Sequence, residues 1–111
     1  MIQTPNRGRP ELDLGDNHWL SFTHWAPDRS LNPQYAHLAD NDRVGGIIRH
    51  KKADGSMCEG SIWFDCDVTR EVFSNHDRWQ VSSWEPLTCS PSFLCHCGDH
   101  GHIRNGKWER A

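Results

Sequence analysis

Regular patterns of hydrophobic and polar residues begin after residue 43, where two strand-like runs flank an Asp-Gly pair. The runs are residues 44–50 and 60–64, with Asp54-Gly55 between them. An Asp-Gly pair between two such runs is typical of a β-hairpin. If the loop consists of those two residues alone, the resulting register predicts that His50 and Cys58 point to opposite faces of the hairpin.

The sharpest hairpin signal lies near the C-terminus. Asn105-Gly106 is typical of a type I′ turn, and this turn would place Ile103 opposite Trp108 as a cross-strand pair. Residues 79–84 predict a further strand, and residues 69–73 predict a helical turn. The second half of the chain is therefore expected to be mostly β.

The first part of the chain shows little periodicity and contains four of the six prolines. Trp19, Phe22 and Trp25 are spaced by three residues, which fits one face of a short helical turn or an aromatic segment docked on a sheet. A short helix is also expected at Pro33, because proline is favoured at the first helical position. This region is therefore interpreted as an irregular arm.

A chain of 111 residues is long enough for one hydrophobic core. Hydrophobic residues make up 35% of it, and six tryptophans stand against one tyrosine, so a few large rings are expected to supply much of the buried surface. The expected fold class is α+β, mostly β, in one small domain built from hairpins. Residues 1–42 would form an irregular acidic arm with the short helix. Residues 43–111 would form a β-rich core held together by a bound zinc ion.

The net charge of −3 is unevenly distributed along the chain. Residues 1–42 carry three arginines and six acidic residues, whereas residues 43–111 carry nine basic and nine acidic residues. Binding to nucleic acid would therefore need a local basic patch. No apolar run approaches the ~20 residues that span a bilayer, and the first ten residues lack the apolar stretch of a signal peptide. The expected location is the cytoplasm, a reducing compartment.

Thiols and imidazoles cluster near the C-terminus. Three of the five cysteines fall within nine residues, and in a reducing compartment this clustering indicates metal ligation before disulfides. Cys95, Cys97 and His100 have a spacing that suits a tetrahedral Zn²⁺ site, and Gly98 and Gly101 would give the loop its backbone freedom. The segment is therefore interpreted as zinc-knuckle-like.

A fourth ligand of a closed site must come from elsewhere in the chain. Cys58 and His50 lie on the two arms of the central hairpin, and since they face opposite sides in the predicted register, only one of them would reach the ion. Both stay open as alternatives. Four further residues are interpreted as spacer, strand or structural positions: His96, His102, Cys66 and Cys89.

Signatures of common enzyme classes are missing. The sequence contains no H-E-x-x-H, no H-x-E before the cysteine pair, no G-x-S-x-G and no Gly-Lys-Ser/Thr. A catalytic zinc would need an open position and a nearby carboxylate, for which Asp99 and Glu85 are the candidates. No catalytic residue is assigned, and Asp99 is expected to orient a ligand imidazole or to cap the loop.

The C-terminal third contains the runs WEPLTCSPS (84–92) and CGDHGHIRNGKW (97–108). It resembles a family of small uncharacterised proteins of tailed bacteriophages and prophages, which share W-E-P-L-T-x-S-P-S and C-G-x-H-G-x-I-R-x-G-x-W. The resemblance covers about thirty residues, with residues 58–61 as a weaker match upstream. Cys89 and His102 depart from the family pattern, which has an aliphatic and an aromatic residue there. The resemblance implies a phage origin and a zinc-knuckle-like end, without implying a reaction.

Three functions follow as hypotheses. The first is a phage accessory binding protein with a structural zinc, which would inhibit a host or defence protein through the acidic arm and anchors such as Trp19 and Trp25. The second is nucleic-acid binding through the basic residues of the two hairpins, which are Arg49, Lys51, Lys52, Arg104, Lys107 and Arg110. The third is a zinc-dependent hydrolase or nuclease, with His50, His100 and the thiols around an open site.

Overall fold

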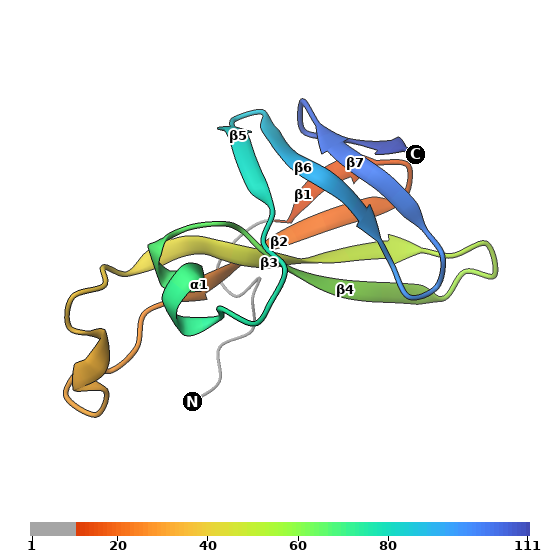
Figure 1. The fold of residues 1–111 in the computed structure, drawn as a ribbon. Coiled ribbons are helices and arrows are strands. Elements are labelled where there is room, and N and C mark those ends of the chain that lie inside the picture. The colour runs from red at the N-terminus through yellow and green to blue at the C-terminus, as the bar shows by residue number, and fades with distance from the viewer. Residues whose placement is uncertain (1–10) are drawn as a thin grey trace.

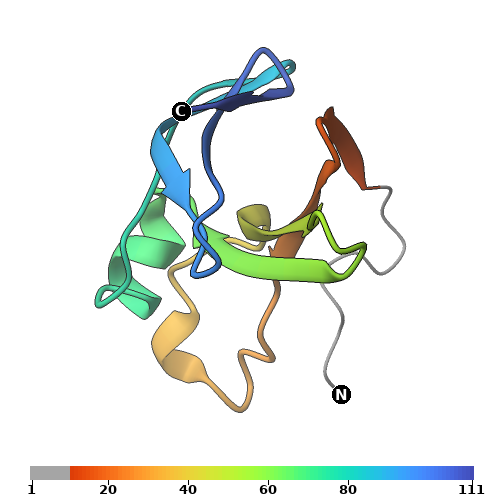
Figure 2. The same ribbon diagram turned by 90° about the vertical axis from the view of Figure 1, so that its right-hand side faces the viewer.

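Eight strands form two antiparallel sheets in the computed structural model, which describes residues 11–111. The first ten residues, which include part of the predicted arm and the stretch considered for a signal peptide, lie outside the described residues. The strand orders are β1-β2-β3-β4 and β5-β6-β7-β8, and the second sheet lies over one face of the first (Figures 1 and 2). The prediction of a mostly β, hairpin-built fold is confirmed.

The first sheet consists of β1 (Leu12–Gly15), β2 (His18–Trp25), β3 (Asn41–Lys51) and β4 (Met57–Trp63). The second sheet consists of β5 (Gln80–Trp84), β6 (Leu87–Leu94), β7 (His100–Arg104) and β8 (Lys107–Arg110). The predicted strand at residues 79–84 is therefore present.

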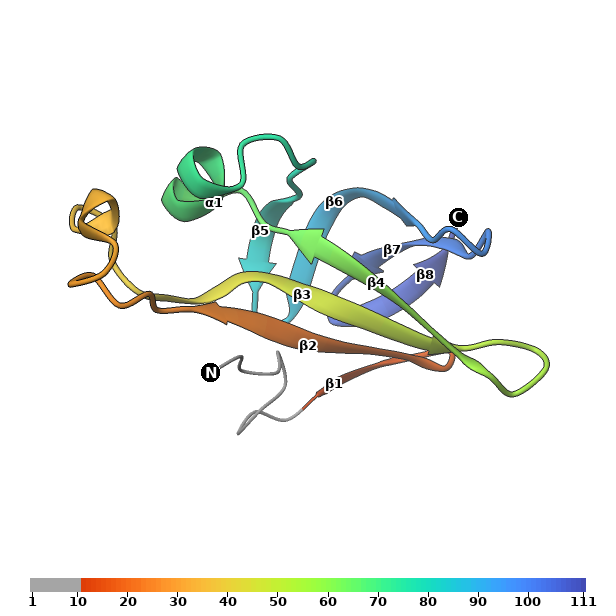
Figure 3. The ribbon, with the colours of Figure 1, turned by 90° about the horizontal axis from the view of Figure 1, so that it is seen from below.

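Two short helical segments lie at the end of β3 that is farther from the β3–β4 loop (Figures 1 and 3). The predicted helix at Pro33 is a single 3₁₀ turn, η1 (Pro33–Tyr35), and the predicted turn at residues 69–73 belongs to the α-helix α1 (Asp67–Val72). Neither segment, nor any other helix among the described residues, has the length and apolar character that crossing a membrane requires.

The main core lies between the sheets and draws on both. Phe64, Leu14 and Leu20 from the first sheet and its end are at most 1% exposed, as is Ile103 from the second. Large rings contribute as expected, since Trp108 is buried and Trp79 packs against the cluster. The main core consists of Leu14, Leu20, Ile48, Ile62, Phe64, Leu87, Cys89, Phe93, Ile103 and Trp108.

The interpretation of residues 1–42 as an irregular arm is wrong for residues 12–25, which form β1 and β2. Trp19, Phe22 and Trp25 all belong to β2, which pairs with β1 on one side and with β3 on the other. Hydrogen bonds to two neighbouring strands outweigh the weak local pattern of this segment, so its residues are extended although no strand period is visible in them. Phe22 accordingly packs against the main core.

The β3–β4 register differs by one residue from the prediction. His50 pairs directly with Cys58, because the loop has three residues, Ala53 to Gly55, instead of two. The Lys52 amide donates to the Ser56 carbonyl at 2.8 Å, the Gly55 amide donates to the Lys52 carbonyl at 2.9 Å, and Gly55 has a φ of +88°. These features describe a type I turn followed by a left-handed residue. A shift of one residue reverses the face of one strand, so His50 and Cys58 point to the same side.

The C-terminal hairpin is confirmed in detail. Ile103 pairs with Trp108, and Asn105 and Gly106 both have positive φ angles, 53° and 73°, as a type I′ turn requires.

Candidate metal centre

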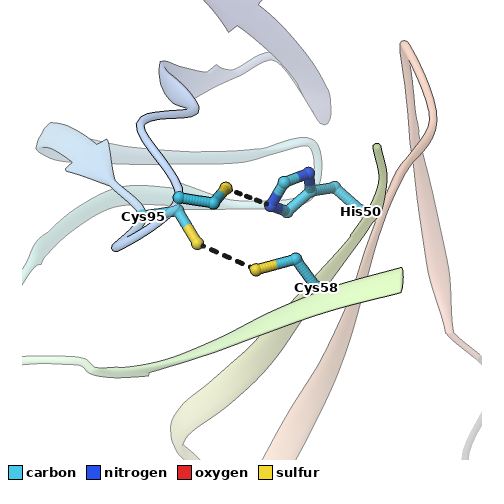
Figure 4. A group of neighbouring side chains, drawn as sticks. His50, Cys58 and Cys95 are labelled. Atoms are coloured by element: carbon cyan, nitrogen blue, oxygen red, sulfur yellow. Dashed lines mark hydrogen bonds between the residues drawn. The ribbon is translucent and has the colours of Figure 1, made fainter. Parts of the chain in front are cut away.

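Four side chains of metal-ligating types meet between the two sheets, near the β3–β4 loop. His50 and Cys58 come from adjacent strands and face the β6–β7 loop, which carries Cys95 and Cys97 (Figure 4). Their ligand atoms all lie within 4.8 Å of one another. The Sγ atoms of Cys58 and Cys95 are 3.4 Å apart, and the Sγ of Cys97 is 3.4 Å from the Nε2 of His50. Tetrahedral zinc would separate two sulfurs by ~3.8 Å and a sulfur and a nitrogen by ~3.6 Å. The group therefore has the dimensions of a metal site.

The β6–β7 loop has the same hydrogen bonds as the β3–β4 loop. The Cys95 amide donates to the Asp99 carbonyl at 2.8 Å, and the Gly98 amide donates to the Cys95 carbonyl at 2.8 Å. Gly98 has a φ of +98°, so its expected conformational role is confirmed. Gly101 has a different role from the expected one, because it lies in β7 against the ring of Trp108. The tight turn brings Cys95 and Cys97 to one side of the loop.

His100, which the sequence predicts as a ligand, is not brought into the group. It begins β7, where it pairs with Leu94, and its Nε2 is 2.7 Å from the Oγ of Ser92. Residues directly opposite each other share a face of the sheet, and Leu94 is 70% exposed. His100 is exposed as well, so the strand directs its imidazole to solvent.

Both alternatives for the fourth ligand are present instead. His50 and Cys58 are 5% and 7% exposed, and they complete a group of four without His100. The expectation that only one of them reaches the ion is wrong, because it depended on the two-residue loop.

The four residues interpreted as non-ligands lie outside the group of four. His96 is exposed, and its Nε2 lies 3.6 Å from the Sγ of Cys58 at the outer edge of the group. Cys89 is part of the core, where burial raises the pKa of its thiol to about 12. Cys66 is the N-cap residue of α1, and His102 lies in β7.

A second layer of side chains surrounds His50. The Oδ2 of Asp99 is 3.9 Å from the Nδ1 of His50 and 2.6 Å from the Nε2 of His18. The distance to His50 is too long for a hydrogen bond, so Asp99 acts on this imidazole through its charge and through His18, to which it is hydrogen-bonded. The Asp99 carboxylate lies nearest to Nδ1 of His50, whereas the other ring nitrogen, Nε2, faces the thiol of Cys97.

His18 is a member of the site that sequence reasoning missed. It is 3% exposed, and its ring stacks on those of His50 and Trp108 at centroid distances of 5.1 Å and 4.1 Å. Its Nδ1 is 2.6 Å from the carbonyl oxygen of Asp16 and its Nε2 is 2.6 Å from the Asp99 carboxylate, so both ring nitrogens contact oxygen atoms. The signal for His18 is long-range, because it reaches the site through its pairing with His50 across β2 and β3.

Electrostatics favour a bound cation in this group. Burial lowers the pKa of His50, which favours the neutral form of its imidazole, the form that binds metals. The hydrogen bond with Cys95, followed by burial, raises the pKa of Cys58 to about 11. The Asp99 backbone amide lowers the pKa of Cys97. The Cys58 thiol therefore resists ionisation when no cation is present, and a bound metal ion would reverse this preference.

Replacing Asp99 by asparagine tests the second layer. We expect Asp99→Asn to weaken metal binding by about 10-fold, because it removes the negative charge 3.9 Å from Nδ1 of His50 and the ion pair that holds the neighbouring His18 ring. Glu85→Gln is the matched control, since it removes the other carboxylate considered from the sequence, which lies outside the group. Competition with a chromogenic chelator measures both affinities, and equal affinities in the two variants would show that Asp99 does not support His50.

Comparisons of the chain with protein-family models, with curated proteins and with solved structures found no match. The resemblance to phage proteins therefore stays a prediction.

Proposed function

We propose that this chain is a small binding protein held together by one structural Zn²⁺. The observation that carries the proposal is the complete set of four ligands, one imidazole and three thiols, of which two come from strands of the first sheet and two from the β6–β7 loop of the second. Sulfur and nitrogen ligands in a tetrahedron suit zinc. A structural zinc site is closed by four protein ligands, whereas a catalytic site keeps one position for water or substrate.

The surroundings of the group support this distinction. The Asp99 carboxylate is hydrogen-bonded to His18, and Glu85 lies in the turn between β5 and β6. Neither carboxylate belongs to the group of four. A hydrolase would need a positioned general base beside an open metal position. These surroundings therefore support a structural role of the zinc over a catalytic role in a hydrolase or nuclease.

Metal analysis and cobalt substitution test the proposal. Purified protein is expected to contain about one zinc per chain, because four ligands fill one tetrahedron. Co²⁺ in place of Zn²⁺ should give the intense visible bands of a tetrahedral thiolate site. Those bands should not change when azide or cyanate is added, since the site has no exchangeable position. Well-folded protein without metal would overturn the structural zinc, and a spectrum that responds to these anions would support the catalytic alternative.

We propose a host bacterial protein as the partner, in line with the phage resemblance, and a location in the host cytoplasm. The acidic residues of the arm are less available than the sequence suggests, since Glu11 pairs with Arg49 and Asp16 with Arg110. Exposed apolar side chains are more suitable anchors. Leu94 and Met57 are 70% and 44% exposed, and each directly adjoins a proposed ligand in the chain.

A second candidate function, nucleic-acid binding, is favoured by one observation. Within residues 11–111 the three lysines form no ion pair with a carboxylate, whereas Arg49 and Arg104 pair with glutamates. Lys51 and Lys52 line two adjoining hollows beside the metal centre, which also share Asn17, Ala53 and Arg110. Unpaired cations in a hollow suit phosphate groups.

A charge reversal tests this second candidate. Lys52→Glu is expected to weaken binding of a single-stranded oligonucleotide about tenfold at low salt and to reduce the salt dependence, because a phosphate contact and its released counterion are lost. Arg104→Glu makes the same change in net charge outside the hollows, so its affinity should remain close to that of the unaltered protein. Titrations at several salt concentrations measure both effects. Absence of binding at low salt would exclude this function.

A further inference from the structure

The three thiols of the metal centre differ in their access to solvent. Cys58 is buried, Cys95 is half-buried and Cys97 is exposed. Cys97 also lines the hollow that contains Lys51 and Lys52. Figure 4 shows the neighbouring side chains of His50, Cys58 and Cys95. A small solute that enters this hollow therefore meets the sulfur of Cys97 before the other two.

We propose that Cys97 and Cys58 form a reversible oxidation site for a hydroperoxide, and that its oxidation releases the zinc ion. The inference depends on the proposed zinc site and adds a reaction of its ligands. Susceptibility of cysteine to oxidation follows thiolate character and exposure. A bound zinc ion would keep all three sulfurs as thiolates, and Cys97 is the exposed one.

The reaction has two balanced steps. The Cys97 thiolate attacks one oxygen of hydrogen peroxide, which breaks the O–O bond, leaves a sulfenic acid on Cys97 and expels hydroxide. The Cys58 thiolate then attacks the sulfenic sulfur, forms an S–S bond and expels the second hydroxide. Two protons from solvent convert the two hydroxides to water. The two sulfurs lose two electrons in total, and the peroxide gains them.

The geometry favours Cys58 over Cys95 as the second partner. The sulfurs of all three residues lie within 4.8 Å of one another, so small side-chain movements suffice for either bond. Cys95 and Cys97, however, are separated by a single residue in a tight turn closed by the Gly98 amide and the Cys95 carbonyl. A bond between them would distort that turn. Cys58 approaches from β4, a separate element, and leaves the turn intact.

The disulfide product would lose the zinc ion but keep a link between the two sheets. His50 and Cys95 alone remain as ligands, which are too few to retain zinc. The new disulfide still connects β4 to the β6–β7 loop, so the two sheets stay joined at the same place. Oxidation would thus exchange a metal link for a covalent link.

The test uses the zinc-loaded full chain and hydrogen peroxide. One equivalent of peroxide is expected to release one zinc ion to a chromogenic chelator, and peptide mapping should find a Cys58–Cys97 disulfide. Dithiothreitol with added zinc should restore the original form. Cys66→Ser is the matched control, since Cys66 lies outside the metal centre, and this variant should release zinc as the unaltered protein does.

A second variant separates the two steps. In Cys58→Ser the sulfenic acid on Cys97 has lost its partner, so labelling of Cys97 by a dimedone probe should increase. If this variant does not fold, the disulfide map of the unaltered chain decides the question. Retention of zinc at equimolar peroxide, or a Cys95–Cys97 disulfide, would overturn the inference. Absence of zinc from the purified chain would instead overturn the proposed function.

Discussion

His50→Ala is expected to abolish stoichiometric zinc binding and to destabilise the fold, whereas His100→Ala should leave both close to those of the unaltered protein. Structural zinc contributes roughly 10–16 kcal/mol of apparent binding free energy in small zinc-finger domains, and removal of one of four ligands sacrifices a large part of such a contribution. His50 belongs to the group of four, and His100 instead contacts Ser92 from the exposed face of β7.

The pair of variants decides between two ligand sets. The spacing of the sequence alone predicts His100 as a ligand, and the structure brings together His50 and Cys58. Zinc content and thermal unfolding with and without a chelator measure the result. If His100→Ala lost zinc and His50→Ala retained it, the observed arrangement of the β6–β7 loop would be incorrect.

Gly45→Ala is expected to destabilise the protein by about 3 kcal/mol, because added atoms in a closely packed site force the backbone to move. A Cβ at Gly45 would collide with the carbonyl oxygen of Ile62 and lie 3.1 Å from the ring of Trp63. Gly45 lies in β3 and is paired with β2 on one side and β4 on the other. β3 therefore cannot move away from Ile62 without disturbing its pairing with β2. Denaturant unfolding at saturating zinc measures the loss.

Gly60→Ala is the matched control in the neighbouring strand. A Cβ at Gly60 meets no heavy atom within 4 Å, and alanine restricts the unfolded chain more than glycine does. This variant is therefore expected to be neutral or more stable by about 0.5 kcal/mol. Equal losses of stability at Gly45 and Gly60 would contradict the steric explanation, since the two substitutions add the same methyl group.

Local chemistry made part of this structure predictable. Asn105-Gly106 needs only its two neighbouring residues to favour a type I′ turn, and the pairing of Ile103 with Trp108 follows from that turn. Cys95 and Cys97 were identifiable for a similar reason, because both ligands lie in one short loop with Gly98. Features encoded within a few consecutive residues were therefore accessible from the sequence.

Features that depend on the exact length of a loop or on distant partners were not accessible. Asp54-Gly55 is compatible with a two-residue or a three-residue loop, and this difference decides whether His50 and Cys58 face one side or two. β2 is identifiable only through its pairing with β1 and β3, so the contribution of His18 to the site was invisible as well. The error about His100 has the same origin, since its direction depends on its partner in β6.

The distance along the chain between the two halves of the metal centre affects the unfolded protein as well as the folded one. Cys58 and Cys95 are 37 positions apart, so the ion would close a long loop that includes α1, β5 and all of β6. Closing such a loop costs entropy that must be lost before the distant contacts form. Either hairpin can form without the other, but the complete ligand set exists only after the sheets have met. Zinc would thus act mainly on the lifetime of the folded state, by slowing unfolding, with little effect on the rate at which the hairpins first form.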